Sequence, residues 1–158
     1  MSEPLLDLTT LLPAECIHLD LVGADAEAVL MELSARVPGL TPAQRDELAA
    51  ALLAREKIHS TGVGDGVALP HTREALAGVL HVPVIVMGRT VAPIDFHDID
   101  AKPVQLFFLI LATNLKEHLG LLARLSRMLR RPMVRKALLT ATDAAAVMQI
   151  IARAQTQR

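Results

Sequence analysis

The fold is decided by residues 55–73, which read REKIHSTGVGDGVALPHTR. A helical pattern ends there in charged residues, three glycines follow within five positions, and a short apolar run then leads to a proline and a histidine. Asp65-Gly66 directly before the apolar run is typical of a tight turn. Pro70 fixes its own φ and keeps the preceding residue extended. The sequence therefore predicts that His71 stands at the end of a strand, on a stiff segment of backbone.

Two helices in a hairpin are expected before this stretch. Apolar residues recur at helical spacing over residues 26–37. Thr41 is a good N-cap for the second helix, with proline at the first position and Gln44 as its capping-box partner, and this helix should run to about Arg55. Two shorter elements come first: a helical turn within residues 5–12 and a strand at residues 16–19.

The period of the apolar pattern changes after the glycines. Residues 67–69 and 82–87 are predicted to be strands, and Pro83 places the second at a strand start or an edge. Residues 104–111 are nearly all apolar, which is typical of a central strand covered on both faces. Residues 94–100 between them are expected to form an exposed connection.

Three helices are expected in the last third of the chain. Asn114 with Glu117 predicts a capping box, and leucines 122, 125 and 129 mark the core face of that helix. Shorter helices should run from Pro132 to about Leu139 and from the Thr142-Asp143 cap onward. The order β-α2-β3-α3 predicts one α/β domain over residues 1–158 (α+β by the grouping of its strands), with a mixed sheet and helices on both faces.

Composition excludes several classes of protein. The 158 residues have a net charge of −1, no Trp or Tyr and only three Phe, so neither a basic field nor stacking platforms point to nucleic acid. Cys16 is the single cysteine, which fits a reducing compartment. The N-terminus lacks a basic leader, and the longest apolar stretch is too short to span a bilayer. We expect a cytoplasmic protein without membrane insertion.

Three side chains are candidates for chemistry. His71 is either a strand-end histidine bonded to backbone or a nucleophile, because neutral imidazole has an ordinary pKa near ~6.5. His118 is either a core histidine whose hydrogen bonds are satisfied, or a residue in the first turn of its helix that donates a hydrogen bond to a bound phosphate. Arg55 either neutralises a helix C-terminus or offers a fork of donors to a phosphoryl group.

Three further patterns favour structural interpretations. Residues 62–66 lack the strand before and helix after that nucleotide loops need, so they are expected to form a turn. An acidic and histidine cluster lacks rigid ligand spacing, so a solvated loop that binds no metal is expected at Asp95, His97, Asp98 and Asp100. Four arginines are expected on the outer face of their helix, solvated or facing an acidic partner: Arg124, Arg127, Arg130 and Arg131.

The whole pattern resembles enzyme IIA of the fructose/mannitol type in the bacterial phosphoenolpyruvate-dependent phosphotransferase system (PTS). The match runs from about Leu5 to Ala154 and is strongest over residues 55–71, which look like the family signature RE…STGxGxGxAxPH. His118-Leu119 resembles the second histidine motif of the family. The resemblance implies a three-layer α/β/α sandwich with a mixed sheet, in agreement with the predicted order of elements.

The resemblance also implies a site. His71 would accept a phosphoryl group from an HPr-like carrier through Nε2, with His118 and Arg55 beside it, and a backbone carbonyl or hydroxyl should hold the other ring N–H. A second tier of phosphoryl contacts is expected at Ser60, Thr61 and Arg73. Thr72 departs from the Gly or Ala that the family often has there. No metal, nucleotide or other cofactor is required, and the domain would be a phosphoryl carrier rather than a turnover enzyme.

The subtype has three alternatives. A domain without an attached IIB or IIC module looks most like the nitrogen-regulatory type, whose partners are regulatory target proteins. A sugar-specific IIA component that passes phosphate to a IIB component is the second. A non-phosphorylated interaction domain of the same fold is the third, and the presence of both histidines and the arginine argues against it.

Overall fold

The computed structural model describes residues 7–72, 80–96 and 102–156. Its elements in chain order are α1 (Leu8–Leu11), the 3-10 turn η1 (Ala14–Cys16), β1 (Ile17–Leu21), α2 (Ala26–Ala35), α3 (Pro42–Ile58), β2 (Gly62–Gly64), β3 (Val67–Ala68), β4 (Val84–Ile94), β5 (Val104–Leu111), α4 (Leu115–Leu129), α5 (Pro132–Thr140) and α6 (Ala144–Thr156). No helix in these ranges is long and apolar enough to cross a membrane.

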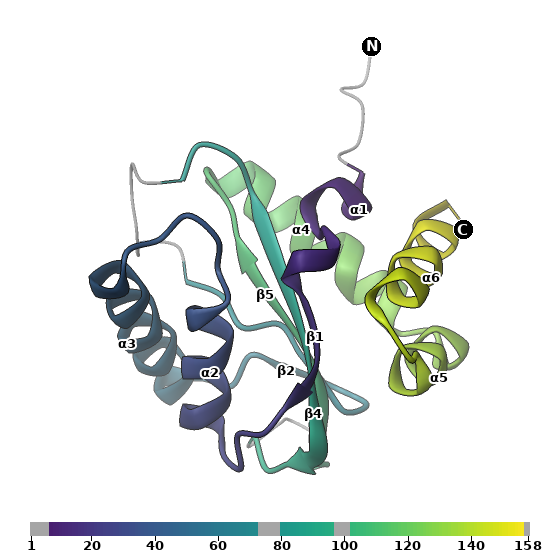
Figure 1. The fold of residues 1–158 in the computed structure, drawn as a ribbon, viewed down its shortest axis with the longest axis horizontal. Helices are drawn as coiled ribbons and strands as arrows, with labels where there is room; N and C mark the ends of the chain where they lie inside the picture. The colour runs from purple at the N-terminus through teal and green to yellow at the C-terminus, as the bar shows by residue number, and fades with distance from the viewer. Residues whose placement is uncertain (1–6, 73–79, 97–101, 157–158) are drawn as a thin grey trace.

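The five strands form one mixed sheet in the order β1-β4-β5-β3-β2. β1 pairs with β4 and β3 with β5 in parallel, whereas β4–β5 and β2–β3 are antiparallel. Helices α2 and α3 cover one face, and α4, α5 and α6 lie on the other (Figure 1). The predicted three-layer arrangement with a mixed sheet is therefore confirmed. The two faces of β5 are buried as its apolar sequence predicted.

The predicted order lacked one strand. Gly62–Gly64 was interpreted as part of a turn, but it forms β2, which pairs with β3 through a two-residue hairpin at Asp65-Gly66. Both turn residues have positive φ, 58° at Asp65 and 79° at Gly66, as two-residue hairpins require. Glycines carry no apolar pattern, so only the pairing with β3 reveals this strand.

Strand β4 is longer than predicted. It continues from Val84 to Ile94 instead of ending at Met87, because pairing with β1 and β5 overrides the polar residues in its second half. Pro83 thus precedes a central strand and not an edge. Residues 94–100 are predicted to form an exposed connection, of which the structure describes residues 94–96. Asp95 is exposed, but Ile94 ends β4 and is buried, and so is Phe96, whose ring lies 5.3 Å from that of Phe107.

The prediction that four arginines face outward is confirmed for two of them and wrong for the other two. Arg127 and Arg130 are exposed. Arg124 instead donates to Oε1 of Gln155 at 3.4 Å, and Arg131 donates to the carbonyl of Ala154. These two side chains are partly buried because α6 packs against the helix face that was expected to meet solvent.

Gly88 in β4 packs closely against Leu21 of β1 and Leu33 of α2. A Cβ built there would overlap Cδ1 of Leu21 and lie 2.8 Å from Cδ2 of Leu33, and both leucines are buried. We expect Gly88→Ala to lower the free energy of unfolding by about 1–3 kcal/mol, since the core must shift to admit the methyl group. Urea unfolding measures this.

The matched control is Gly120→Ala in α4, where an added Cβ has no atom within 4 Å. That change should raise stability by about 0.5–1 kcal/mol, because alanine is the better helix former. Equal midpoints for Gly88→Ala and the parent would show that Leu21 and Leu33 move aside without cost.

Candidate functional site

An open cleft of about 620 Å³ lies between the end of α3, the segment after β3 and the start of α4. Its described lining residues are Ala51, Ala54, Arg55, Ile58, His71, Thr72, Leu115, His118, Leu119 and Leu122. The structure therefore brings together the two histidines and the arginine singled out from the sequence, which come from three different segments of the chain.

His71 is held by the sheet and by its own backbone. It forms a parallel bridge to Ile110 of β5, and the amide of Ile110 donates to the carbonyl of Pro70 at 3.0 Å. Nδ1 of His71 lies 2.7 Å from the carbonyl oxygen of Leu69. A carbonyl oxygen can only accept, so Nδ1 carries the proton and Nε2 bears the lone pair of the neutral ring. The backbone contact expected to fix the tautomer is present.

His118 lies at the end of the first turn of α4. Asn114 caps this helix through Oδ1, which accepts from the amide of Glu117 at 2.8 Å. Glu117 does not complete the predicted capping box, because its Oε1 accepts from the amide of Thr113 instead. The backbone amide of His118 already donates to the carbonyl of Asn114. The imidazole, and not the amide, is therefore the group of His118 that can bind a ligand in the cleft.

The two imidazoles are in contact. Their ring centroids lie 4.9 Å apart with an interplanar angle of 62°, an edge-to-face arrangement. The side chain of His118 is 4% exposed, whereas His71 is partly exposed. His71 is therefore the more accessible of the two, and the ring of His118 packs against it.

Arg55 combines its two interpretations. Its Nη1 donates to the carbonyl of His59 at 2.6 Å and so satisfies the C-terminus of α3. Arg55 also lines the cleft that contains both histidines. A guanidinium has five N–H donors, so the bond to His59 leaves capacity to bind an anion there.

Ser60 and Thr61 are engaged elsewhere. The hydroxyl of Ser60 donates to the carbonyl of Phe96 at 3.1 Å. The amide and hydroxyl of Thr61 donate to the two carboxylate oxygens of Glu56 at 2.8 and 2.6 Å. Neither residue is among the described lining of the cleft. Their contacts fix the loop between α3 and β2. Glu56, in the last turn of α3, holds this loop and was not among the residues predicted from the sequence.

The rim of the cleft is apolar, which the sequence analysis also missed. Ile58 is 82% exposed, and Leu115 and Leu119 are 51% and 56% exposed. Leu115 and Leu119 stand seven and three residues before Leu122, so they continue an apolar row of α4 that the sequence already showed. Large exposed apolar side chains gathered at the edge of a cleft are typical of a surface that another macromolecule covers.

Four residues of the predicted sites lie outside the described part of the chain: Arg73, His97, Asp98 and Asp100. Within the described residues, no group of three or more His, Cys, Asp or Glu is arranged to hold a metal ion.

The absence of a metal at the acidic cluster therefore stays a prediction. Because Asp95 and its neighbours follow one another on a single segment, they lack the spacing of a rigid site. Elemental analysis of the purified protein should find no stoichiometric divalent ion. One tightly held zinc per chain would contradict this.

Comparison with known proteins defines the class. Residues 10–154 match the family model described as "Phosphoenolpyruvate-dependent sugar phosphotransferase system, EIIA 2". The chain therefore belongs to the type 2 EIIA family of the PTS, as the motifs indicated.

The individual relatives are nitrogen regulatory proteins and sugar-specific EIIA components. The chain is 35% identical over 151 residues to a nitrogen regulatory protein of Bradyrhizobium diazoefficiens, which covers 92% of this chain and 94% of that protein. It is 36% identical over 150 residues to a fructose-specific EIIABC component of Bacillus subtilis, but that match spans 91% of this chain and only 23% of the relative's length. The crystal structure of nitrogen regulatory protein IIA-Ntr from Neisseria meningitidis superposes with a TM-score of 0.81 at 32% identity, covering 91% of this chain and 98% of that one.

Proposed function

We propose that the protein is a phosphohistidine carrier, which accepts a phosphoryl group on Nε2 of His71 from an HPr-like phosphocarrier protein. The observation that carries this proposal is the 2.7 Å contact between Nδ1 and the Leu69 carbonyl, because it leaves the lone pair on Nε2. The ring with this fixed tautomer lines one cleft with His118 and Arg55.

The proposed phosphoryl transfer requires no cofactor. Nε2 of His71 attacks phosphorus in line, the bond from phosphorus to the donor's histidine nitrogen breaks, and its electron pair returns to the donor ring. Positive charge then develops on the His71 ring, and the Leu69 carbonyl stabilises it by accepting from Nδ1–H. Catalysis of such a step is mainly positioning and charge stabilisation. Arg55 and His118 supply donors to the phosphoryl oxygens.

The apolar rim supports a protein as the phosphoryl donor. Ile58 on α3 and Leu115 and Leu119 on α4 stand on opposite sides of the cleft, where a docked domain would cover them. A small phosphate ester would gain nothing from these side chains. The proposal therefore needs a folded partner whose own phosphorylated histidine reaches into the cleft.

A regulatory role of the nitrogen type is the first form of the proposal. The Bradyrhizobium diazoefficiens relative and the Neisseria meningitidis structure, which carry this name, match over 94% and 98% of their own lengths. A sugar-specific IIA that passes phosphate to a IIB component is the alternative, supported by the fructose-specific relative of similar identity. Transfer from the phosphorylated protein to a fructose-type IIB component would favour the alternative. The cytoplasmic location stays a prediction, which cell fractionation tests.

The experiment that tests the carrier role is reconstitution of the phosphoryl relay. The protein is incubated with labelled phosphoenolpyruvate, enzyme I and HPr, and the label on the chain is quantified. We expect one acid-labile, base-stable phosphoryl group per chain, as expected for a phosphohistidine. No transfer in the complete mixture would overturn the proposal.

A further inference from the structure

The segment that carries His71 and the helix that carries His118 lie side by side and run in opposite directions. At one end, His71 and Thr72 share the cleft described above with the first two turns of α4. At the other end, a second cleft of about 330 Å³ is lined by residues 62–65 of the hairpin, by Ser126, Leu129 and Arg130 from the end of α4, and by His59. The hairpin tip therefore meets the C-terminus of α4, and His71 meets its N-terminal half.

The two neighbours have similar lengths. The chain from Asp65 to His71 begins with the two turn residues and is extended over residues 67–71, so its six steps span at most roughly 20 Å at about 3.3 Å per residue. The helix from His118 to Leu129 covers eleven residues, or roughly 17 Å at about 1.5 Å per residue. A contact between the hairpin turn and the end of α4 therefore also sets the distance between the imidazoles of His71 and His118 at the opposite end.

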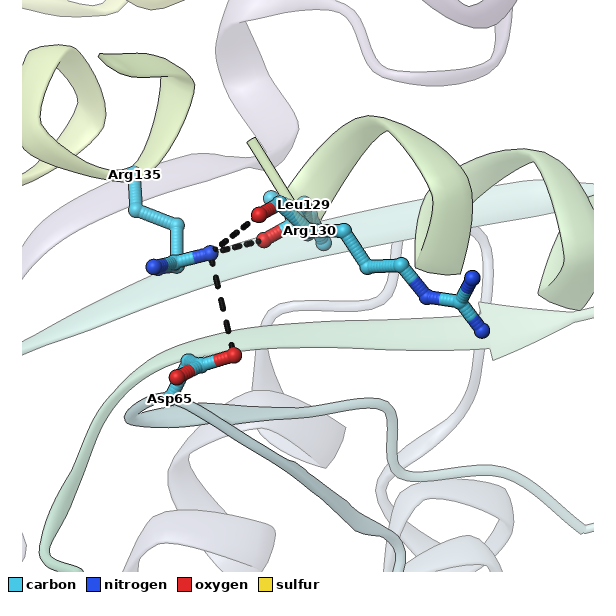
Figure 2. Close-up of polar contacts among 4 residues, drawn as sticks. All are labelled: Asp65, Leu129, Arg130 and Arg135. Atoms are coloured by element: carbon cyan, nitrogen blue, oxygen red, sulfur yellow. Dashed lines mark hydrogen bonds and ion pairs between the residues drawn. The ribbon is translucent and has the colours of Figure 1, made fainter. Parts of the chain in front are cut away.

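Arg135 of α5 makes that distant contact, as Figure 2 shows. Its Nη1 donates to the carbonyls of Leu129 at 2.9 Å and Arg130 at 2.7 Å, the last carbonyls of α4. The same nitrogen lies 3.8 Å from Oδ2 of Asp65 in the hairpin turn. One guanidinium thus joins the end of α4 to the tip of the hairpin.

The hairpin tip is also fixed to the sheet. The carbonyl of Gly66 accepts from the amides of Gln105 and Leu106 at 3.0 and 3.2 Å. The tip and His71 are therefore both bonded to β5, so the hairpin cannot shift along the sheet without breaking these bonds. Helix α4 packs on the sheet through side chains, which resist sliding less than backbone bonds do. The joint at Arg135 opposes such a slide.

We propose that Arg135 and Asp65 are positioning residues, which set the axial register of α4 against the hairpin and so hold His118 against His71. The inference rests on the proposed function, because its readout is phosphoryl transfer. A misplacement of about 1 Å at a reacting centre can slow a reaction by about a hundredfold. The pair itself contributes little to stability, since the Asp65 side chain is 53% exposed. The register of α4, and not the stability of the fold, is therefore what the joint controls.

The test is a double-mutant cycle with Asp65→Asn, Arg135→Gln and both together. Asparagine tolerates the positive φ at position 65, so the first variant removes the charge and keeps the turn. Single-turnover transfer from phospho-HPr to His71 is measured over a range of donor concentrations. We expect each single variant to lower the transfer rate constant about 2- to 5-fold with an unchanged half-saturating donor concentration, and the double variant to fall no further.

Arg127→Gln is the matched control. It removes the same charge from an exposed position on α4, and it should transfer at the parent rate. In spectra of ring nitrogens, the His118 signals should move in both Asp65→Asn and Arg135→Gln and stay in place in Arg127→Gln.

The outcomes separate the two proposals. A parent protein that takes up no label would contradict the proposed function itself. A labelled parent with Asp65→Asn at the parent rate would overturn the positioning role alone, as would a double variant whose losses multiply. Should Arg135→Gln unfold because the end of α4 loses its donor, Asp65→Asn decides, since its change is confined to an exposed carboxylate.

Discussion

The His71→Ala protein is expected to take up no phosphoryl group from phospho-HPr, a loss of at least a hundredfold against the parent. Its ring lines the cleft, and its tautomer places the lone pair on Nε2. We do not expect His118 to replace it as acceptor, because His118 is 4% exposed and its ring packs against that of His71. The measurement is label per chain after incubation with phosphoenolpyruvate, enzyme I and HPr.

The control for this prediction is His81→Ala. His81 is exposed and is not among the described lining residues of the cleft, so its removal should leave the label unchanged. Thermal unfolding of both variants establishes that they are folded. Label that persists in folded His71→Ala protein would place the acceptor on another residue.

Local rules predicted the helices well because their signals lie within a few residues of one another. Thr41 and Gln44 form the complete capping box expected from the sequence. Asp143 likewise caps α6, with Oδ1 accepting from the amide of Ala146 at 2.8 Å. These bonds close within one turn, so the order of residues is enough to predict them.

The sheet was predicted less completely because its pairing is not local. β2 consists of glycines and a single valine, and it becomes a strand only because β3, which itself pairs with β5, lies beside it. The second half of β4 carries polar residues that a central position in the sheet tolerates. Patterns of apolar residues cannot show which strand will lie next to such a segment.

The candidate site divides in the same way. His71, His118 and Arg55 were found from motif and position, and the structure places them in one cleft. Ser60 and Thr61 lie in the same motif, but the structure bonds their hydroxyls to Phe96 and Glu56. A sequence motif does not show which residues of a loop line a binding site and which stabilise the loop itself. The contacts of Arg135 depend on how α5 folds back over α4, and no spacing in the sequence indicates them.

The second large effect is expected at the residues that support the acceptor. His118 lies against His71, and the loss of a charge-assisted bond of about 1.5–3 kcal/mol corresponds to roughly a ten- to hundredfold loss in rate. We therefore expect His118→Ala to be labelled on His71 slowly, with His118→Gln intermediate because its amide keeps a donor. Single-turnover transfer from phospho-HPr measures both. Parent rates in folded His118→Ala would mean that this histidine is only a core residue.

Arg55→Lys separates the two interpretations of the arginine. Lysine keeps a cation near the carbonyl of His59 and therefore the favourable charge at the end of α3, so the midpoint of unfolding should change little. It loses the planar fork that binds two phosphoryl oxygens, so transfer should slow about tenfold. Unfolding and transfer are measured on the same sample. A variant that transfers at the parent rate would show that Arg55 acts only on the helix terminus, whereas slow transfer with unchanged stability would assign it to the phosphoryl group.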